Sequence, residues 1–196
     1  FEIRRLHEAF GITTLYVTHD QAEAMVISDR IAVLERGRVA QVGTADTLFH
    51  APRTRFVAEF IGKTNVVEGT AVSADTVERS GLRLRVAGAA FGPGRRVGVS
   101  IRPHLITLQA AATAPAGAGA GHRVRGLVRR AAFLRDAVEY EVQVDGTGLG
   151  LRVAAPVSPR LAPGAAVALG IGPAACVPLA AEGSDGLPSP QRGGTK

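Results

Sequence analysis

The stretch GITTLYVTHDQAEAM, residues 11–25, is the part of the sequence that decides the fold. Residues 13–18 are mostly β-branched, aromatic or aliphatic, which predicts a short buried strand. The polar pair His19-Asp20 follows directly, and Asp20 is a suitable N-cap for a helix over residues 21–27. A buried strand followed at once by a helix is typical of α/β sheets, so we expect an α/β fold for this part of the chain.

On both sides of this stretch, hydrophobic periodicity predicts further helices and strands. Ile3, Leu6 and Phe10 lie at helical spacing, and Gly11 ends that helix. The expected elements are a helix over residues 1–10, a hairpin of strands 31–34 and 39–42, and helices over residues 44–50 and 54–61. Thr44 or Asp46 can cap the first of the two later helices, and Gly62 ends the second.

From about residue 65 the pattern changes to short alternating segments separated by glycine and proline. Alternation is clearest in residues 140–144, and turns are expected at residues 92–94, 145–146 and 163–164. Many short strands joined by glycine turns predict a small all-β barrel. The expected strands are residues 66–72, 82–86, 96–101, 124–133, 138–144, 149–153 and 166–171. Residues 110–120, rich in alanine and glycine, predict a flexible loop within this barrel.

Composition and charge exclude several classes of protein. The chain has 196 residues, a net charge of +6 and 46% hydrophobic residues, which is globular composition. The arginines are dispersed and lack interleaved aromatic residues, so we expect no nucleic-acid partner. No run approaches the roughly 18 apolar residues of a membrane-spanning helix. The histidines neither cluster nor show metal-ligand spacing, and Cys176 has no second cysteine, so we expect no metal site and a cytoplasmic location.

Residues 11–25, together with residues 28–31 and the pair Gly43-Thr44, resemble the end of the ATPase domain of ABC transporters. In that family the histidine at the end of this strand contacts the γ-phosphate of ATP. The resemblance therefore implies that His19 is both a catalytic and a cofactor-binding residue, with ATP and Mg²⁺ as the cofactors of the full subunit.

The chemistry of His19 agrees with this role. Open α/β sheets bind nucleotides just beyond the carboxyl ends of their strands, and an imidazole there can donate a hydrogen bond to a phosphoryl oxygen. A histidine at this place can also serve only to cap the following helix. We interpret its neighbours as structural: Asp20 as the N-cap, Gln21 and Glu23 as solvated helix residues, and Met25 as core packing.

The phosphate-binding loop of the family, Gly-x-x-x-x-Gly-Lys-Ser/Thr, does not occur in this sequence. Lys63-Thr64 lacks the earlier glycine and precedes a strand, so it is interpreted as a linker. The acidic strand end and the signature segment of the family are also missing. We therefore expect a C-terminal fragment of a longer subunit, which alone is inactive and binds no cofactor.

The second half resembles the accessory oligonucleotide-binding-like (TOBE) domain of import subunits. The motifs that carry this resemblance are residues 60–62 with Asn65, residues 100–103, and residues 126–128 with 133–134. This sequence departs from the family pattern at Ala45, His104 and Arg135. We divide the chain into the C-terminal part of the ATPase domain (residues 1–62), the OB-like β domain (residues 63–180) and a disordered tail (residues 181–196).

The resemblance implies an energy-coupling subunit of an ABC importer for a polyamine, iron(III) or a similar small ion. Its implied partners are a second ATP-binding subunit in a homodimer, the membrane permease subunits and, indirectly, an extracytoplasmic solute-binding protein. Its implied location is the inner face of the cell membrane. Two alternatives from other classes remain: a non-catalytic regulatory or dimerisation module, and an OB-type nucleic-acid binder.

Overall fold

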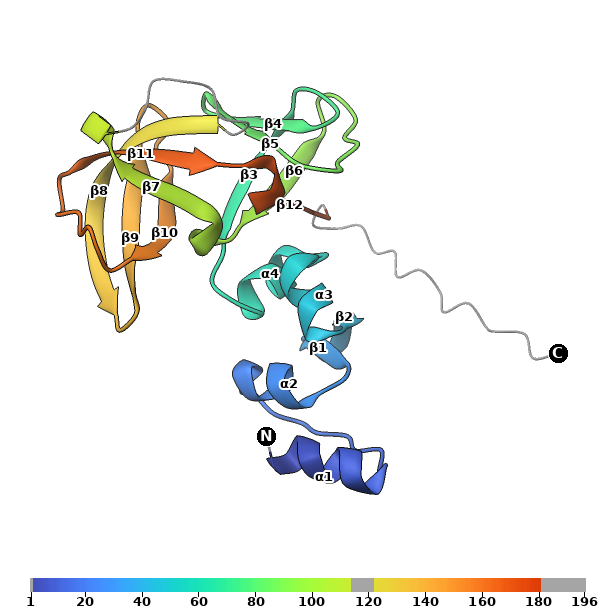
Figure 1. Ribbon diagram of the computed structural model, residues 1–196. Helices are drawn as coiled ribbons and strands as arrows, with labels where there is room; N and C mark the ends of the chain where they lie inside the picture. The colour runs from blue at the N-terminus through green and yellow to red at the C-terminus, as the bar shows by residue number, and fades with distance from the viewer. Residues whose placement is uncertain (1, 114–121, 181–196) are drawn as a thin grey trace.

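The computed structural model describes residues 2–113 and 122–180. The N-terminal helices and a small hairpin lie at one end of the molecule, and a β domain lies at the other (Figure 1). The N-terminal elements are α1 (Glu2–Phe10), α2 (Gln21–Ile27), β1 (Ile31–Glu35), β2 (Arg38–Gly43), α3 (Ala45–His50) and α4 (Arg55–Phe60). These bounds confirm the helices and the hairpin predicted for this part of the chain.

Local capping explains where α3 and α4 begin. The Thr44 side chain accepts a hydrogen bond from the backbone N–H of Thr47, and Thr54 does the same for Val57. Thr44 is therefore the cap of α3, and Asp46 lies inside its first turn. The buried residues Val33, Leu48, Val57 and Ile61 form a small hydrophobic core between the hairpin and these two helices.

The strand predicted over residues 13–18 is wrong. In the structure residues 12–17 belong to no helix or strand, and the hairpin β1–β2 forms a two-stranded sheet by itself. A strand needs the N–H and C=O groups of a neighbouring strand, and none lies beside this segment in the described part of the chain. Its apolar side chains are accordingly exposed, with Leu15 91% and Val17 88% accessible.

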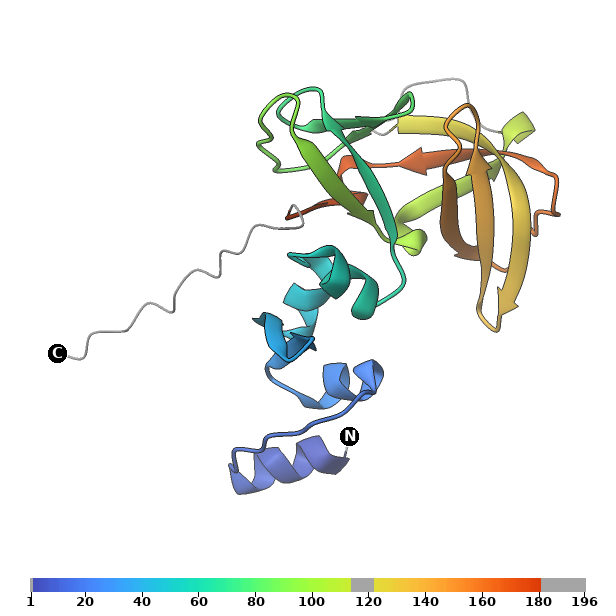
Figure 2. The ribbon, with the colours of Figure 1, turned by 180° about the vertical axis from the view of Figure 1, so that it is seen from behind.

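The β domain consists of two five-stranded antiparallel sheets, in the orders β10-β9-β8-β11-β7 and β12-β6-β3-β4-β5. Figure 2 shows the two sheets curving around a shared interior. The side chains that fill it include Val99, Ile101, Val142, Val153 and Leu169, each fully buried. The strands are β3 (Asn65–Ala71), β4 (Thr76–Arg79), β5 (Leu82–Arg85), β6 (Arg96–Ile101), β7 (Ile106–Ala110), β8 (His122–Leu134), β9 (Ala137–Val144), β10 (Gly150–Pro156), β11 (Ala166–Ile171) and β12 (Cys176–Leu179).

Two similar turns carry the chain from one sheet to the other. The segment Ile101-Arg102-Pro103 leads from β6 into a short 3₁₀ helix and then into β7. The segment Ile171-Gly172-Pro173 leads in the same way from β11 into β12. As a result β6 pairs with β12, with Ile101 opposite Cys176, and β11 pairs with β7, with Ile171 opposite Ile106. The two crossings thus join the sheets into a closed core.

The structure confirms the seven strands predicted for the β domain and adds β4, β7 and β12. Of the predicted loop over residues 110–120, residue 110 belongs to β7 and residues 111–113 form a 3₁₀ helix. Residues 114–121 and the predicted disordered tail lie outside the described residues. The division of the chain at residue 62 stays a prediction.

Candidate functional site

A set of local hydrogen bonds holds the corner that contains His19. The Asp20 carboxylate accepts a hydrogen bond from the backbone N–H of Glu23 at 3.0 Å, which confirms Asp20 as the N-cap of α2. The Thr18 hydroxyl accepts from the backbone N–H of Asp20 at 3.0 Å and donates to the Glu23 carboxylate at 3.1 Å. A hydrogen bond to Glu23 also raises the pKa of the Tyr16 hydroxyl above its ordinary value.

Because Asp20 makes the capping bond, the His19 ring is not needed for it. The side chain of His19 is exposed and lines a cavity of about 150 Å³. The walls come from the start of α2, from residues 31–34 of β1, and from Phe60 and Ile61 at the end of α4. At about 30 Å³ for each water, this volume holds a phosphoryl-sized group with a few waters and is too small for a whole nucleotide.

A second set of contacts joins the N-terminal half to the β domain through Arg102. This arginine is only 4% exposed. Its guanidinium donates hydrogen bonds to the backbone carbonyls of Phe49 at 2.8 Å, Ala58 at 3.1 Å, Gly62 at 3.2 Å and Lys63 at 3.4 Å. It also lies 4.2 Å from the centre of the Phe49 ring, within the range of a cation–π contact. Burial lowers the pKa of Arg102 from its ordinary value.

The sequence reasoning missed this role, because it treated residues 100–103 only as a motif of resemblance. The signal in the sequence was the position of Arg102 between Ile101 and Pro103 at the end of a strand. A charged side chain that is buried there needs hydrogen-bond partners from the protein. His104, which departs from the family pattern, stacks on Phe49: the centres of the two rings lie 6.0 Å apart.

Asn65 makes a comparable connection inside the β domain. Its amide nitrogen donates to the carbonyls of Ile101 at 3.2 Å and Arg152 at 2.8 Å, and its carbonyl oxygen accepts from the N–H of Arg152 at 2.7 Å. Arg152 lies on β10, which is the outermost strand of its sheet. The Asn65 side chain therefore supplies the hydrogen bonds that a further strand would supply there.

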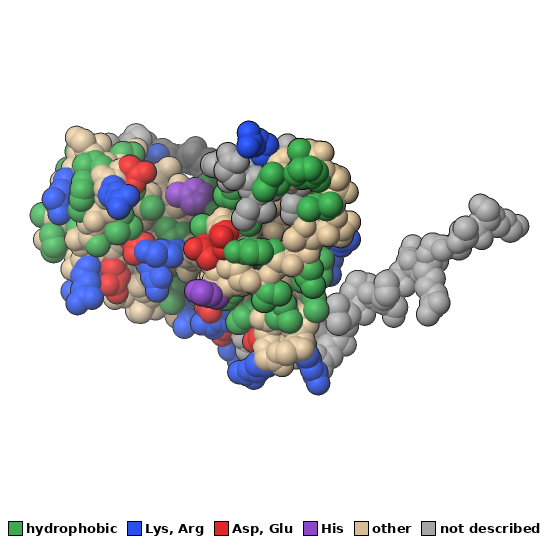
Figure 3. Space-filling view, turned by 90° about the horizontal axis from the view of Figure 1, so that it is seen from below, with side chains coloured by type: hydrophobic (Ala, Val, Ile, Leu, Met, Phe, Trp, Pro, Cys, Tyr) green, Lys and Arg blue, Asp and Glu red, His purple; other side chains and the backbone are tan. Residues whose placement is uncertain are grey.

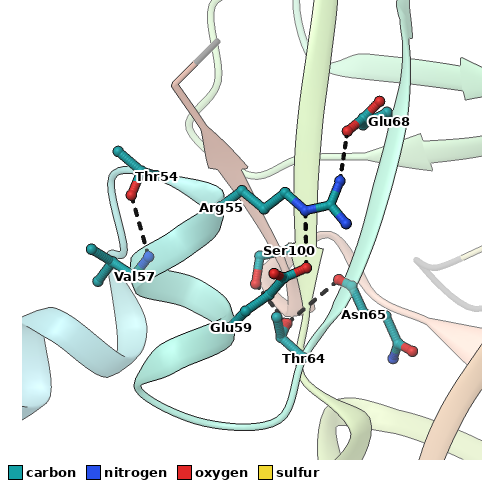
Figure 4. A network of polar contacts seen from close by, with 8 residues as sticks. All are labelled: Thr54, Arg55, Val57, Glu59, Thr64, Asn65, Glu68 and Ser100. Atoms are coloured by element: carbon teal, nitrogen blue, oxygen red, sulfur yellow. Dashed lines mark hydrogen bonds and ion pairs between the residues drawn. The ribbon is translucent and has the colours of Figure 1, made fainter. Parts of the chain in front are cut away.

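Figure 4 shows the neighbouring surface contacts between α4 and β3. Arg55 donates to Glu59 on its own helix and to Glu68 on β3, both at 2.9 Å. Thr64 and Ser100 share a hydrogen bond of 2.7 Å. The Arg55 and Glu68 side chains are 45% and 44% exposed, so this ion pair adds little stability, on the order of 0.2–1 kcal/mol. Arg102, by contrast, is buried, and it contacts α4 through the carbonyl of Ala58.

A wider cavity of about 510 Å³ opens beside this joint, between α4 and the outer face of β8, β9 and β10. Cross-strand register places Glu141 opposite both Arg130 and Arg152. The charged side chains that line the cavity are those of Arg55, Arg130 and Arg152, and of Glu59, Glu139 and Glu141. Their formal charges cancel, so the cavity presents a mixed polar surface and no concentrated positive charge. In the part of the chain that the structure describes, no cluster of metal-ligating side chains forms.

Comparisons with known proteins find a family match within the β domain and relatives that match a longer part of the chain. Residues 99–179 match the family described as TOBE domain. The Fe(3+) ions import ATP-binding protein FbpC of Brucella abortus is 38% identical over 148 residues, which cover 74% of this chain and 39% of that protein. An FbpC protein of Rhizobium meliloti is 39% identical over 146 residues, covering 72% of this chain and 39% of the relative.

The spermidine/putrescine import ATP-binding protein PotA of Rubrobacter xylanophilus is 48% identical over 114 residues, or 54% of this chain and 30% of that protein. The chain thus spans about two fifths or less of the length of these relatives. Among solved structures, the cytoplasmic molybdate-binding protein ModG superposes with a TM-score of 0.51 at 14% identity, over 58% of this chain and 94% of ModG. That likeness shows the fold of the β domain alone.

Proposed function

We propose that this chain, which carries a TOBE domain and resembles the C-terminal part of ABC-importer ATP-binding subunits, couples ATP hydrolysis to solute import as part of such a subunit. The observation that carries the proposal is the length of the similarity. An alignment of 148 residues is longer than residues 99–179 can supply, so the likeness to import subunits extends beyond the TOBE domain.

In this proposal His19 contacts the γ-phosphate of ATP. Its support is the shape of the corner: the ring is exposed, it is not used as a helix cap, and it faces a cavity of phosphoryl size. An imidazole placed there donates a hydrogen bond to a phosphoryl oxygen or orients the attacking water. ATP and Mg²⁺ would otherwise be held by residues outside this chain, because its sequence has no phosphate-binding loop.

Exposed apolar side chains around His19 support a further protein surface in the working subunit. Phe10, Leu15 and Val17 are 71%, 91% and 88% accessible. Figure 3, which views the molecule from the α1 end, shows hydrophobic side chains gathered on this part of the surface. Apolar exposure of this extent marks an interaction site. We assign it to a contact with another part of the complete ATP-binding subunit.

The proposed partners follow from the same assignment. They are a second ATP-binding subunit, with which the subunit forms a homodimer, and the membrane permease subunits, with a solute-binding protein acting through the permease. The proposed location is the cytoplasmic face of the membrane. The described residues contain no helix long and apolar enough to cross a bilayer. The solute is proposed to be iron(III) or a polyamine, the classes named in the relatives.

The test begins with the gene upstream of the codon for Phe1, read in the same frame, and continues with ATP hydrolysis by the complete purified subunit. His19→Ala is expected to lower kcat by about 100-fold or more, the usual contribution of a positioned acid or base. Arg38→Ala, at an exposed position of the hairpin, is the control and keeps wild-type activity. Hydrolysis that survives His19→Ala unchanged would refute the role of His19.

An upstream frame without a phosphate-binding loop would refute the catalytic proposal and leave the non-catalytic regulatory or dimerisation module. Nucleic-acid binding is the outcome least supported, because basic side chains alternate with acidic and apolar ones on the face that Figure 3 shows and the wider cavity is lined by three arginines and three glutamates. Binding to phosphate backbones would weaken steeply with salt. A single-stranded oligonucleotide that fails to bind even at low salt removes that alternative.

A further inference from the structure

Arg102 belongs to the β domain, yet its hydrogen bonds end on the segment that forms one wall of the His19 cavity. Three of its four acceptors are the carbonyls of Ala58, Gly62 and Lys63. Phe60 and Ile61, which line the His19 cavity, lie in the chain between Ala58 and Gly62. The last turn of α4 is thus held from one side by Arg102 and faces His19 on the other.

The contact of Arg102 with α4 is specific in geometry. In the described part of the chain, Arg102 has no ion pair with a carboxylate, so its buried charge is stabilised only by carbonyl dipoles and the Phe49 ring. Because an unsolvated guanidinium is costly, all of these acceptors must stay in place around its planar fork. A shift of the β domain relative to α4 would break several of these bonds together.

The end of α4 is in turn packed firmly against the elements that position His19. Ile61 is 5% exposed, and it belongs to the same buried cluster as Val33 of β1. Val33 and Ile61 both line the cavity, together with the first residues of α2. A close-packed core transmits a displacement of one side chain to its neighbours. The physical path therefore runs from Arg102 through α4 and Ile61 to the wall of the His19 site.

We propose that Arg102 is a positioning residue that makes the placement of His19 depend on the placement of the β domain. This inference rests on the proposed function, since it concerns the same γ-phosphate site. Removing the guanidinium then alters the rate of ATP hydrolysis by freeing the α4 wall, although Arg102 itself has no contact with the nucleotide. The wider cavity between α4 and the sheet lies beside this path.

The test uses the complete subunit with Arg102→Met, which keeps an apolar stem and removes the guanidinium. The expected result is a fall in kcat of about tenfold or more, with the KM for ATP nearly unchanged, because misplacing a reacting group by about 1 Å costs up to about 100-fold. Amide hydrogen exchange should rise both at residues 58–63 and at residues 21–27. Arg102→Lys restores the charge without the fork, so it should recover only part of kcat.

Val153→Ala is the matched control. Val153 lies on β10 and is fully buried in the β core. The alanine variant therefore weakens the β domain, and it is expected to leave kcat and the exchange of residues 21–27 unchanged. If Arg102→Met, or Arg102→Lys where the methionine variant does not fold, changes exchange only at residues 58–63 and leaves kcat at the wild-type value, the inference is wrong. If the wild-type subunit does not hydrolyse ATP, or His19→Ala has no effect, the proposed function fails instead.

Discussion

Replacing Asn65 with alanine should destabilise the β domain, because it removes three hydrogen bonds between strands. The side chain is 8% exposed and makes three hydrogen bonds to backbone groups of Ile101 and Arg152. On the alanine variant the N–H of Arg152 loses its acceptor at the open edge of β10, and two carbonyls lose a donor. A buried polar group without a partner costs about 1–3 kcal/mol, and partial access of water to the edge strand lowers the sum. We expect a loss of about 3 kcal/mol.

Urea unfolding of the chain, followed by circular dichroism, measures this loss as a shift of the midpoint at constant slope. For a chain of this size about 3 kcal/mol corresponds to a fall in Tm of roughly 6–12 °C. Gln143→Ala is the control on the same sheet, because its amide makes one half-buried hydrogen bond to the Leu149 carbonyl. It should cost about 1 kcal/mol. Equal losses for the two variants would refute the account of Asn65 as the substitute strand.

Two further predictions concern the buried Cys176 and the close approach of β3 to β4 at Gly69 in the β domain. Burial raises the pKa of the Cys176 thiol to about 12 from 9.0, so the thiol stays protonated in the folded chain while the unfolded chain ionises near pH 9. The stability contributed by this group is fully present below pH 9 and is lost as the pH rises towards 12. A thiol reagent at pH 8 should therefore react with Cys176 only after denaturant is added. Rapid reaction with the folded chain would contradict this prediction. Gly69→Ala places a Cβ 2.5 Å from the Glu78 carbonyl oxygen and should lower the free energy of unfolding by about 1–3 kcal/mol. Gly92→Ala is the control and should be neutral, because a Cβ there meets nothing within 4 Å. Equal urea midpoints for the two variants would show that β3 can move away from β4.

The sequence predicted those elements whose stabilising contacts lie within a few residues. Asp20 and Thr44 cap α2 and α3 through backbone groups three residues ahead, so their patterns were sufficient. The hairpin β1–β2 was predictable for a similar reason. Its turn places Arg36 and Gly37 at φ values of 51° and 78°, next to strands with alternating burial.

The strands that the sequence did not predict are short or carry atypical residues. β4 has four residues with two charges, and β12 contains Pro178, which weakens a strand pattern. β12 is stabilised by pairing with β6, which is distant in sequence, whereas β4 pairs with its sequence neighbours β3 and β5. The failed prediction over residues 13–18 is the opposite case. Its side chains favour a strand, but in the described chain no partner strand supplies the hydrogen bonds.

The sequence by itself determined the helices, the hairpin β1–β2 and seven of the ten described strands of the β domain. It also singled out His19 as the candidate site residue and carried the resemblance to import subunits. Only the tertiary structure decided which of two similar turns joins the halves of the molecule. Arg102 and Gly172 occupy the same place in Ile-x-Pro turns, but of the two only Arg102 has a side chain, and it donates a hydrogen bond to the Ala58 carbonyl of α4. The physical reason is that the charge of Arg102 is stabilised by carbonyls of residues 49, 58, 62 and 63, which are distant in sequence and come together only when both cores are packed.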